Sequence, residues 1–315
     1  MKISVVTPVY NSELSLCELA MRLRPVLEDL ADEYELILVN DGSKDRSWEV
    51  ICELTSQNRW IRGLNLMRNY GQHNALLCGI RAALYEIIVT IDDDLENPPE
   101  EIPKLLEKLN EEYDVVYGTP KKEEHGLWRD IASQLTKIAL QSSMGVTIAR
   151  KVSAFRVFRT ELREAFNNYQ CPFISIDVLL TWGTTRFASI PVHHDPRRLG
   201  KSNYTIRKLV THALNMMTGF STLPLQLASI IGFAFTVFGV GVLGYVISVY
   251  FIHGRSVPGF YFLASIIAIF SGAQLFALGI IGEYLARMHS RSMGKPPSVI
   301  RDTVGFCSHR KVRIV

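Results

Sequence analysis

The chain has 315 residues, of which 48% are hydrophobic, and its mean hydropathy of +0.12 is high for a purely soluble protein. A net charge of only +3 gives no overall attraction to nucleic acid, so we expect no nucleic-acid partner. The five cysteines are scattered, odd in number and without a CxxC pair, which indicates reduced thiols and argues against a disulfide framework.

The first half of the chain alternates between strand-like and helix-like segments. Short aliphatic or β-branched runs predict strands at residues 3–7, 36–39, 61–66 and 87–91. The spacing of apolar residues between them predicts helices at residues 13–30, 45–57 and 73–85. This alternation predicts an α/β domain whose parallel sheet is covered on both faces, with ligands bound beyond the carboxyl ends of the strands.

The fourth strand-like run ends in three consecutive aspartates, Asp92, Asp93 and Asp94, with Glu96 just beyond. Like charges in a row repel one another, so this segment indicates a site that receives a cation. Polar segments also follow the three earlier strands, and we expect all four to meet on one rim of the sheet: residues 8–11, 40–43, 68–72 and 92–96.

The way this rim binds phosphate depends on a motif that the sequence lacks. There is no GxGxxG after the first strand and no GxxxxGK[ST], so the usual helix-terminus cradle for a diphosphate is missing. Carboxylates hold a diphosphate only through a divalent cation, and Mg²⁺ or Mn²⁺ prefers oxygen ligands. Asp92 and Asp94 are therefore candidate metal ligands. The alternative is a solvated acidic turn that precedes a helix near Glu100.

The second half of the chain is strongly apolar. No Asp, Glu, Lys or Arg occurs between residues 209 and 254 or between 256 and 282, so two transmembrane helices are expected at about 225–252 and 260–282. The alternative is a pair of buried helices in a soluble bundle. Lys and Arg flank both runs, whereas Arg255 alone lies between them, so the positive-inside rule predicts that both termini are cytoplasmic.

These features predict four parts. They are a cytosolic domain (1–204), a juxtamembrane amphipathic segment (205–222), a two-helix transmembrane hairpin (223–284) and a cytosolic tail (285–315). A helix with one apolar face is also expected at 127–143, either in the membrane interface or packed on the sheet. The expected location is the inner (cytoplasmic) membrane.

Five motifs occur in order: TPVYN, NDGS, NYGQH, TIDDDLENPPEEIPKL and IPVHHDPRRLGKSNY. Together with the C-terminal hairpin, they make the chain resemble the family 2 glycosyltransferases of GT-A fold. Within that family, the chain resembles the branch of polyprenyl-phosphate glycosyltransferases. This branch includes undecaprenyl-phosphate glucosyl and aminoarabinosyl transferases and dolichol-phosphate mannose synthase. The resemblance implies a metal-dependent, inverting transfer of a sugar from a nucleotide-sugar, such as a UDP-sugar, to a polyprenyl phosphate. It also implies a role in cell-envelope glycan modification and a homo-oligomer, a tetramer in this family.

The resemblance also implies roles for individual residues. Asp41 and the segment 8–11 would hold the nucleoside. Asp92 and Asp94 would bind the metal, with Asp94 the more direct ligand, and Glu96, where the family usually has Gln, would be a third metal residue. The residues implied in substrate binding on the rim are Pro8, Tyr10, Asn11, Asp41, Asn69, Gly71, Gln72, Asp92 and Asp93. A basic loop before the membrane would close over the nucleotide and the acceptor phosphate with Arg197, Lys201, Ser202 and Tyr204.

The position of the general base departs from this pattern. The branch often has Asp immediately before Phe-Arg, and Ala154 stands there in this chain. A phosphate monoester is already largely a dianion at neutral pH, so it needs charge compensation more than a base. We therefore expect Arg156 and Arg197 to hold the acceptor phosphate. Asp177 is a fallback base, or else a buried structural carboxylate.

Two other functions compete with this one. A processive polysaccharide synthase would normally carry QxxRW late in its catalytic domain, whereas QNRW at 57–60 has the wrong spacing and lies too early. A catalytically inactive, membrane-tethered nucleotide-sugar-binding homologue would explain the missing Asp before Phe155. The intact Asp92 and Asp94 argue against it.

Overall fold

The computed structural model describes residues 1–120, 152–171, 174–195, 223–253 and 259–306. The predictions for the segments 127–143 and 205–222 concern residues outside these ranges. The α-helices are α1 (Leu16–Leu30), α2 (Ser47–Gln57), α3 (Gln72–Ala82), α4 (Ile102–Leu109), α6 (Ile176–Leu180), α8 (Leu223–His253) and α9 (Phe260–Ser292). The strands are β1 (Lys2–Val9), β2 (Glu33–Asn40), β3 (Ile61–Leu66), β4 (Ile87–Thr90), β5 (Val115–Pro120), β6 (Arg156–Arg159), β7 (Phe187–Val192) and β8 (Ile300–Val304).

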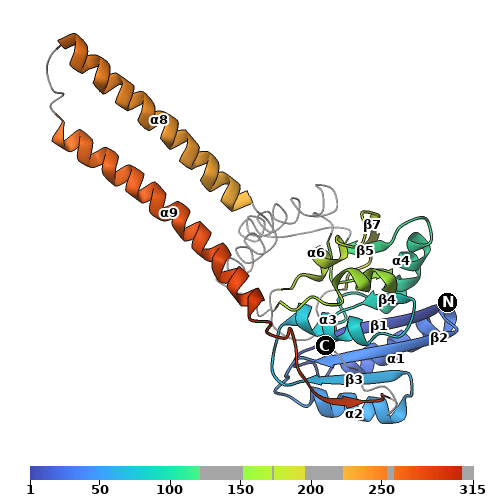
Figure 1. The fold of residues 1–315 in the computed structure, drawn as a ribbon. Coiled ribbons are helices and arrows are strands. Elements are labelled where there is room, and N and C mark those ends of the chain that lie inside the picture. Colours follow the sequence, from blue (N-terminus) through green and yellow to red (C-terminus); the bar gives the residue numbers. More distant parts are fainter. Residues whose placement is uncertain (121–151, 172–173, 196–222, 254–258, 307–315) are drawn as a thin grey trace.

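An eight-stranded sheet with the order β7-β5-β6-β4-β1-β2-β3-β8 organises the first domain (Figure 1). The four strands expected from the sequence are all present, and β4, β1, β2 and β3 pair in parallel. The expectation of a parallel sheet is wrong at three pairs, because β6 runs antiparallel to β4 and β5, and β8 runs antiparallel to β3. The domain is therefore an α/β fold with a mixed sheet.

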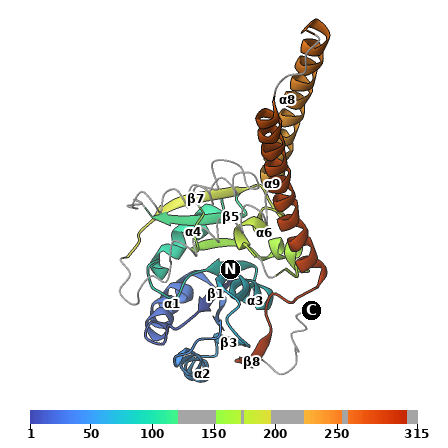
Figure 2. The ribbon, with the colours of Figure 1, turned by 90° about the vertical axis from the view of Figure 1, so that its left-hand side faces the viewer.

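Helices cover both faces of this sheet, as expected (Figure 2). One apolar core contains the buried side chains of α3 and α6, and the other contains those of α1, α2 and α4. The parallel strands are buried over nearly their whole length, as in β3, where all six residues are buried. Because both faces of these strands are buried, each strand ends where its apolar run ends, and the polar segments that follow begin at the edge of the sheet.

The helices α8 and α9 lie side by side and project away from the sheet domain (Figure 1). By length and composition, the segments Pro224–Ile252 and Ile269–Ser292 within them could each cross a membrane. Many of their large apolar side chains are exposed, including Phe233 at 72% and Phe251 at 80%. An apolar surface of this extent on a helical hairpin indicates a non-aqueous surrounding or a partner.

The end of the chain differs from the predicted tail at 285–315. Helix α9 continues to Ser292, ten residues past the predicted span, and Arg287 bonds to Glu283 one turn earlier at 2.8 Å. After the helix the chain returns to the domain and adds β8 to the free edge of β3. Residues 300–304 are therefore an integral strand of the sheet.

Candidate active site

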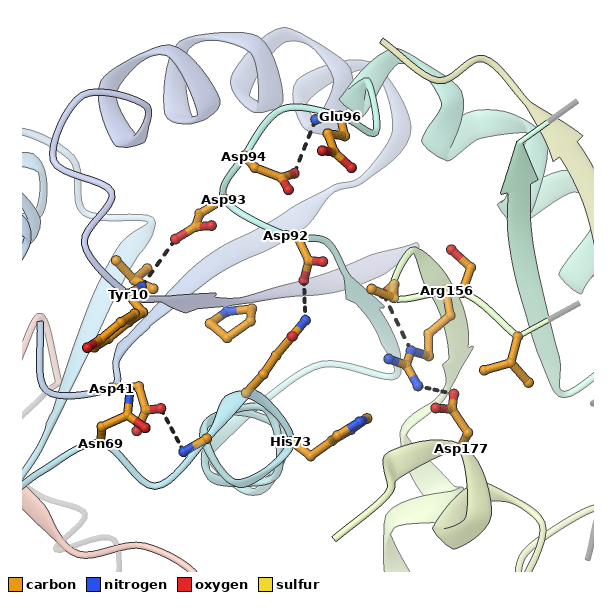
Figure 3. A pocket seen from close by; sticks show the side chains of 17 residues that line it. Tyr10, Asp41, Asn69, His73, Asp92, Asp93, Asp94, Glu96, Arg156 and Asp177 are labelled. Atoms are coloured by element: carbon orange, nitrogen blue, oxygen red, sulfur yellow. Dashed lines mark hydrogen bonds and ion pairs between the residues drawn. The ribbon is translucent and has the colours of Figure 1, made fainter. Parts of the chain in front are cut away.

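A pocket of about 580 Å³ lies at the carboxyl ends of β1, β2 and β4, beside the loop that follows β3 (Figure 3). This volume is in the range of small-molecule sites. The lining residues are Pro8, Val9, Tyr10, Asp41, Asn69, Gly71, Gln72, His73, Asp92, Asp93, Asp94, Glu96, Val152, Ser153, Ala154, Arg156 and Asp177. The four polar segments thus contribute to one pocket, as parallel strands require.

Asp41 joins two of these segments from the inside. Its side chain is buried, and its two carboxylate oxygens accept the backbone N–H groups of Tyr70 at 2.7 Å and Gly71 at 2.8 Å. Burial raises the pKa of this carboxyl group, and the two backbone hydrogen bonds oppose that rise. Gly42 is required here, because its φ is +67° and a Cβ would lie 2.6 Å from the Arg68 carbonyl carbon.

The three consecutive aspartates point in different directions, and each holds a different part of the rim (Figure 3). Asp92 accepts a hydrogen bond from Gln72 Nε2 at 2.8 Å, and Asp93 accepts one from the backbone N–H of Tyr10 at 3.3 Å. Asp94 accepts the backbone N–H of Glu96 at 3.2 Å. The carboxylates therefore order the β1, β3 and β4 loops as well as charging the pocket.

The crowding of these groups has an electrostatic cost. Burial, followed by the charges of Asp94 and Asp93, raises the pKa of Asp92 to about 7, and burial raises that of Asp93 to about 6. Leu95 adds backbone strain, because its φ of +61° is in the left-handed region, which costs a non-glycine residue roughly 1–2 kcal/mol. Its buried side chain packs in the core and holds this turn in place.

A divalent cation would lower the electrostatic cost of this arrangement. Within the described residues, no three His, Cys, Asp or Glu side chains converge as a complete protein cage. Mg²⁺ does not need one, since it is usually bound through one or two carboxylates together with waters and substrate phosphates. Asp92 and Asp94 fit that type of site, and Glu96 lies beside them with His194 Nε2 3.6 Å from its carboxylate.

Arg156 and Asp177, to which the sequence analysis gave separate roles, form one buried ion pair at the side of the pocket (Figure 3). Arg156 is only 1% exposed, and its Nε also donates to Thr90 Oγ1 at 3.0 Å. Asp177 accepts a further hydrogen bond from the Tyr117 hydroxyl at 3.2 Å. The charge of Arg156 is thus already compensated within the protein, and Asp177 is partnered.

The remaining expected residues divide into two groups. Asn11 does not line the pocket, but its backbone N–H bonds to Ser43 Oγ at 3.0 Å and its Oδ1 accepts the Lys44 N–H at 2.8 Å. The members of the basic loop lie outside the described residues: Arg197, Lys201, Ser202 and Tyr204.

His73 and Ser153 also line the pocket, although no role was predicted for them from the sequence. His73 lies at the start of α3, and its Nδ1 accepts the backbone N–H of Ile176 at 3.4 Å. It is the last residue of the NYGQH motif, so that motif carried a signal for it. Ser153 Oγ accepts a local hydrogen bond from the backbone N–H of Phe155 at 3.2 Å, and the sequence around it has no comparable signal.

Several solved structures share this fold. Glucosyl-3-phosphoglycerate synthase from Mycobacterium tuberculosis, in complex with Mn²⁺, UDP-glucose and phosphoglyceric acid, is 20% identical with a TM-score of 0.52, over 69% of this chain and 77% of that one. The same enzyme with Mn²⁺, UDP and glucosyl-3-phosphoglycerate gives 20% identity and a TM-score of 0.51 over the same shares of the chains. A mycobacterial protein gives 18% identity and a TM-score of 0.52, over 69% of this chain and 72% of that one.

The sequence itself matches a family model. The match to "Glycosyl transferase family 2" extends over residues 4–168, just over half of the chain, and includes β1 to β4 and the aspartates of the pocket. The chain belongs to glycosyl transferase family 2 and has an α/β domain of GT-A fold.

Proposed function

We propose that this protein is a membrane-anchored, metal-dependent, inverting glycosyltransferase that moves a sugar from a nucleotide-sugar to a polyprenyl phosphate. One observation carries the proposal. A carboxylate-lined pocket of family 2 lies in the same chain as a hairpin of two long apolar helices. The product would be a lipid-linked sugar of the kind used in cell-envelope glycan modification.

The donor is a nucleoside diphosphate sugar, and a UDP-sugar is the proposed form. The similar M. tuberculosis enzyme has been crystallised with UDP-glucose and Mn²⁺, which supports this choice. Tyr10, Asp41 and Asn69 lie on the side of the pocket proposed for the nucleoside. Asp41 lines the pocket itself and also holds the loop at Tyr70 and Gly71 in place.

Mg²⁺ or Mn²⁺ is the proposed cofactor, with Asp92 and Asp94 as its ligands and Glu96 beside them. The bound ion supplies Lewis-acid neutralisation of the charge that develops on the leaving diphosphate. Asp92 and Asp93 also keep the loops of Gln72 and Tyr10 in place before the donor arrives. This order in the free protein lowers the cost of forming the complete site.

The acceptor proposal rests on the hairpin and on the chemistry of phosphate. A lipid phosphate dianion at the membrane surface needs an oriented cation more than a proton acceptor. Arg197 and Lys201, in the segment before α8, are the proposed phosphate contacts. Since Asp177 already compensates Arg156, we propose that Arg156 contributes directional N–H groups at the pocket wall rather than a net charge.

The arrangement in the membrane follows from the distribution of charge. Lys and Arg flank the hairpin on its outer sides, which supports cytoplasmic termini and a catalytic domain on the cytoplasmic face of the inner membrane. The exposed apolar surface of α8 and α9 also supports a homo-oligomer, with the tetramer as the proposed form.

The acceptor class is tested by offering the purified protein a panel of nucleotide-sugars with polyprenyl phosphate or with phosphoglyceric acid. Mass spectrometry should detect a glycosylated polyprenyl phosphate with at least one donor, and the Asp94→Asn variant provides the background. Transfer to phosphoglyceric acid alone would contradict the lipid acceptor, and a growing polymer would indicate a processive synthase.

The metal site is tested by replacing its aspartates with asparagine, which removes the negative charge and keeps the shape of the side chain. Asp94→Asn should lower transfer by roughly 100- to 1,000-fold, because it removes a preorganised contact that compensates charge in the transition state. Asp92→Asn should lower it by about 10- to 100-fold. Glu100→Gln is the matched control and should retain activity, because Glu100 is exposed in the 3-10 helix Pro99–Glu101 that follows the loop and pairs with Arg22 away from the pocket. Full activity of Asp94→Asn, or of the wild type in excess chelator, would refute the assignment.

Substitution of Asp177 distinguishes a structural role of this carboxylate, as the partner of Arg156, from a catalytic role. Asp177→Asn leaves a buried guanidinium without its partner and should lower the free energy of unfolding by about 3–5 kcal/mol in a denaturant titration. Transfer per folded molecule should remain within about tenfold of the wild type, because no carboxylate base is required. A well-folded Asp177→Asn protein that binds donor but has lost transfer by about 1,000-fold or more would identify Asp177 as the base.

A further inference from the structure

The strand β8 pairs with β3 at the edge of the sheet, next to the loop that leads from β3 to the proposed donor side of the pocket. It follows the membrane helix α9 and lies beyond residues 4–168, the part matched by the family. Its pairing with β3 is regular from Gly63 to Asn65 and then shifts register at Leu66, opposite Ile300. The backbone N–H of Met67 continues the contact by donating to the Val299 carbonyl at 2.9 Å.

The first connection to the pocket runs through Arg301. Its Nη2 donates to the carbonyl of Met67 at 3.2 Å, two residues before Asn69, which lines the pocket. The loop that starts at Met67 is therefore held at two points. Arg301 fixes its beginning from outside the sheet, and Asp41 fixes its end through the N–H groups of Tyr70 and Gly71.

The second connection is a chain of buried amides. Asp302 accepts from Asn65 Nδ2 at 3.3 Å, and Asn65 Oδ1 accepts from Asn40 Nδ2 at 2.9 Å. Asn40 Oδ1 then accepts the backbone N–H of Ser43 at 3.3 Å, and Ser43 Oγ accepts that of Asn11 at 3.0 Å. Asp302 is exposed, whereas Asn65 and Asn40 are 7% and 3% exposed, so water has little access to the two amides.

The orientation of these amides depends on the partner at the outer end. The carboxylate of Asp302 accepts but cannot donate, so it fixes the NH₂ group of Asn65 toward β8 and the oxygen toward Asn40. Loss of that acceptor leaves a buried donor unpaired and allows Asn65 to turn over. If Asn65 turns over, Asn40 must turn over too in order to keep its hydrogen bond to Asn65. Its oxygen then no longer faces the Ser43 N–H, which lies next to the segment that carries Tyr10.

We propose that β8 is a positioning element for the donor pocket, in which Asp302 and Arg301 hold the loops that bind the nucleoside diphosphate. This inference rests on the proposed donor class. It gives the returning C-terminal segment a role besides covering a sheet edge. The strand joins the end of the membrane hairpin to the loops at residues 8–11 and 67–71, so anchoring and donor binding share one structural element.

The test uses the full-length protein in detergent with UDP and Mn²⁺ as the probe. Asp302→Ala should raise the Kd by about 3- to 10-fold, the range expected for one hydrogen bond. Asp302→Asn keeps an acceptor oxygen and should restore wild-type affinity. Thr303→Ala, on the exposed part of the same strand, is the matched control. Arg301→Ala tests the other connection and should weaken binding to a similar extent.

Amide hydrogen exchange provides a readout that needs no ligand. Asp302→Ala and Arg301→Ala should speed exchange at Tyr70 and Gly71, whose N–H groups bond to Asp41. Wild-type affinity and wild-type exchange in both variants would overturn the inference, whether or not β8 itself stays protected. A wild-type protein that fails to bind UDP with Mn²⁺ would contradict the proposed donor, and the exchange rates would still decide the role of β8.

Discussion

The main physical constraint on this structure is the crowding of three carboxylates at the carboxyl end of β4. Burial, followed at Asp92 by the charges of its neighbours, raises the pKa of Asp92 to about 7, and burial raises that of Asp93 to about 6. Each carboxylate is nevertheless used, since Asp92 and Asp93 hold loops from two other strands. A site with this charge is stabilised by a cation, and a cation bound there attracts a diphosphate. A divalent metal and a nucleotide-sugar donor both fit this feature, and the family itself is shown by the match over residues 4–168.

A second buried ionic group lies on the side of the pocket that is proposed for the acceptor. The pair of Arg156 and Asp177 presents a polar, neutral wall to the pocket, supported by Thr90 and Tyr117. A neutral wall beside an acidic rim leaves the acceptor phosphate dependent on cations from elsewhere in the chain. In the proposed function, these cations come from the basic segment that precedes α8 in the sequence.

The sequence predicts local features well and long-range pairings poorly. The apolar run before Asp92 ends at a strand terminus because burial on both faces of the sheet requires continuous apolar residues. By contrast, Arg156 and Asp177 are 21 residues apart on separate elements, and no periodicity links them. The strand β8 is harder still, because IRDTV is short and half polar, and Asp302 meets Asn65 across 237 residues. Its β-branched Ile300, Thr303 and Val304 favour a strand, but no local pattern identifies β3 as the partner.

The most direct test of the account is the coupling between Mn²⁺ and UDP. At about pH 8, where Asp92 and Asp93 are ionised, UDP should bind at least about 100-fold more tightly with Mn²⁺ than with excess chelator. The coupling should shrink as the pH falls through about 7, because protons compete with the metal for Asp92, and further below about 6, where the neighbouring Asp93 also loses its charge. Equal affinity for UDP with and without Mn²⁺ at about pH 8 would contradict the claim that a cation completes the acidic rim.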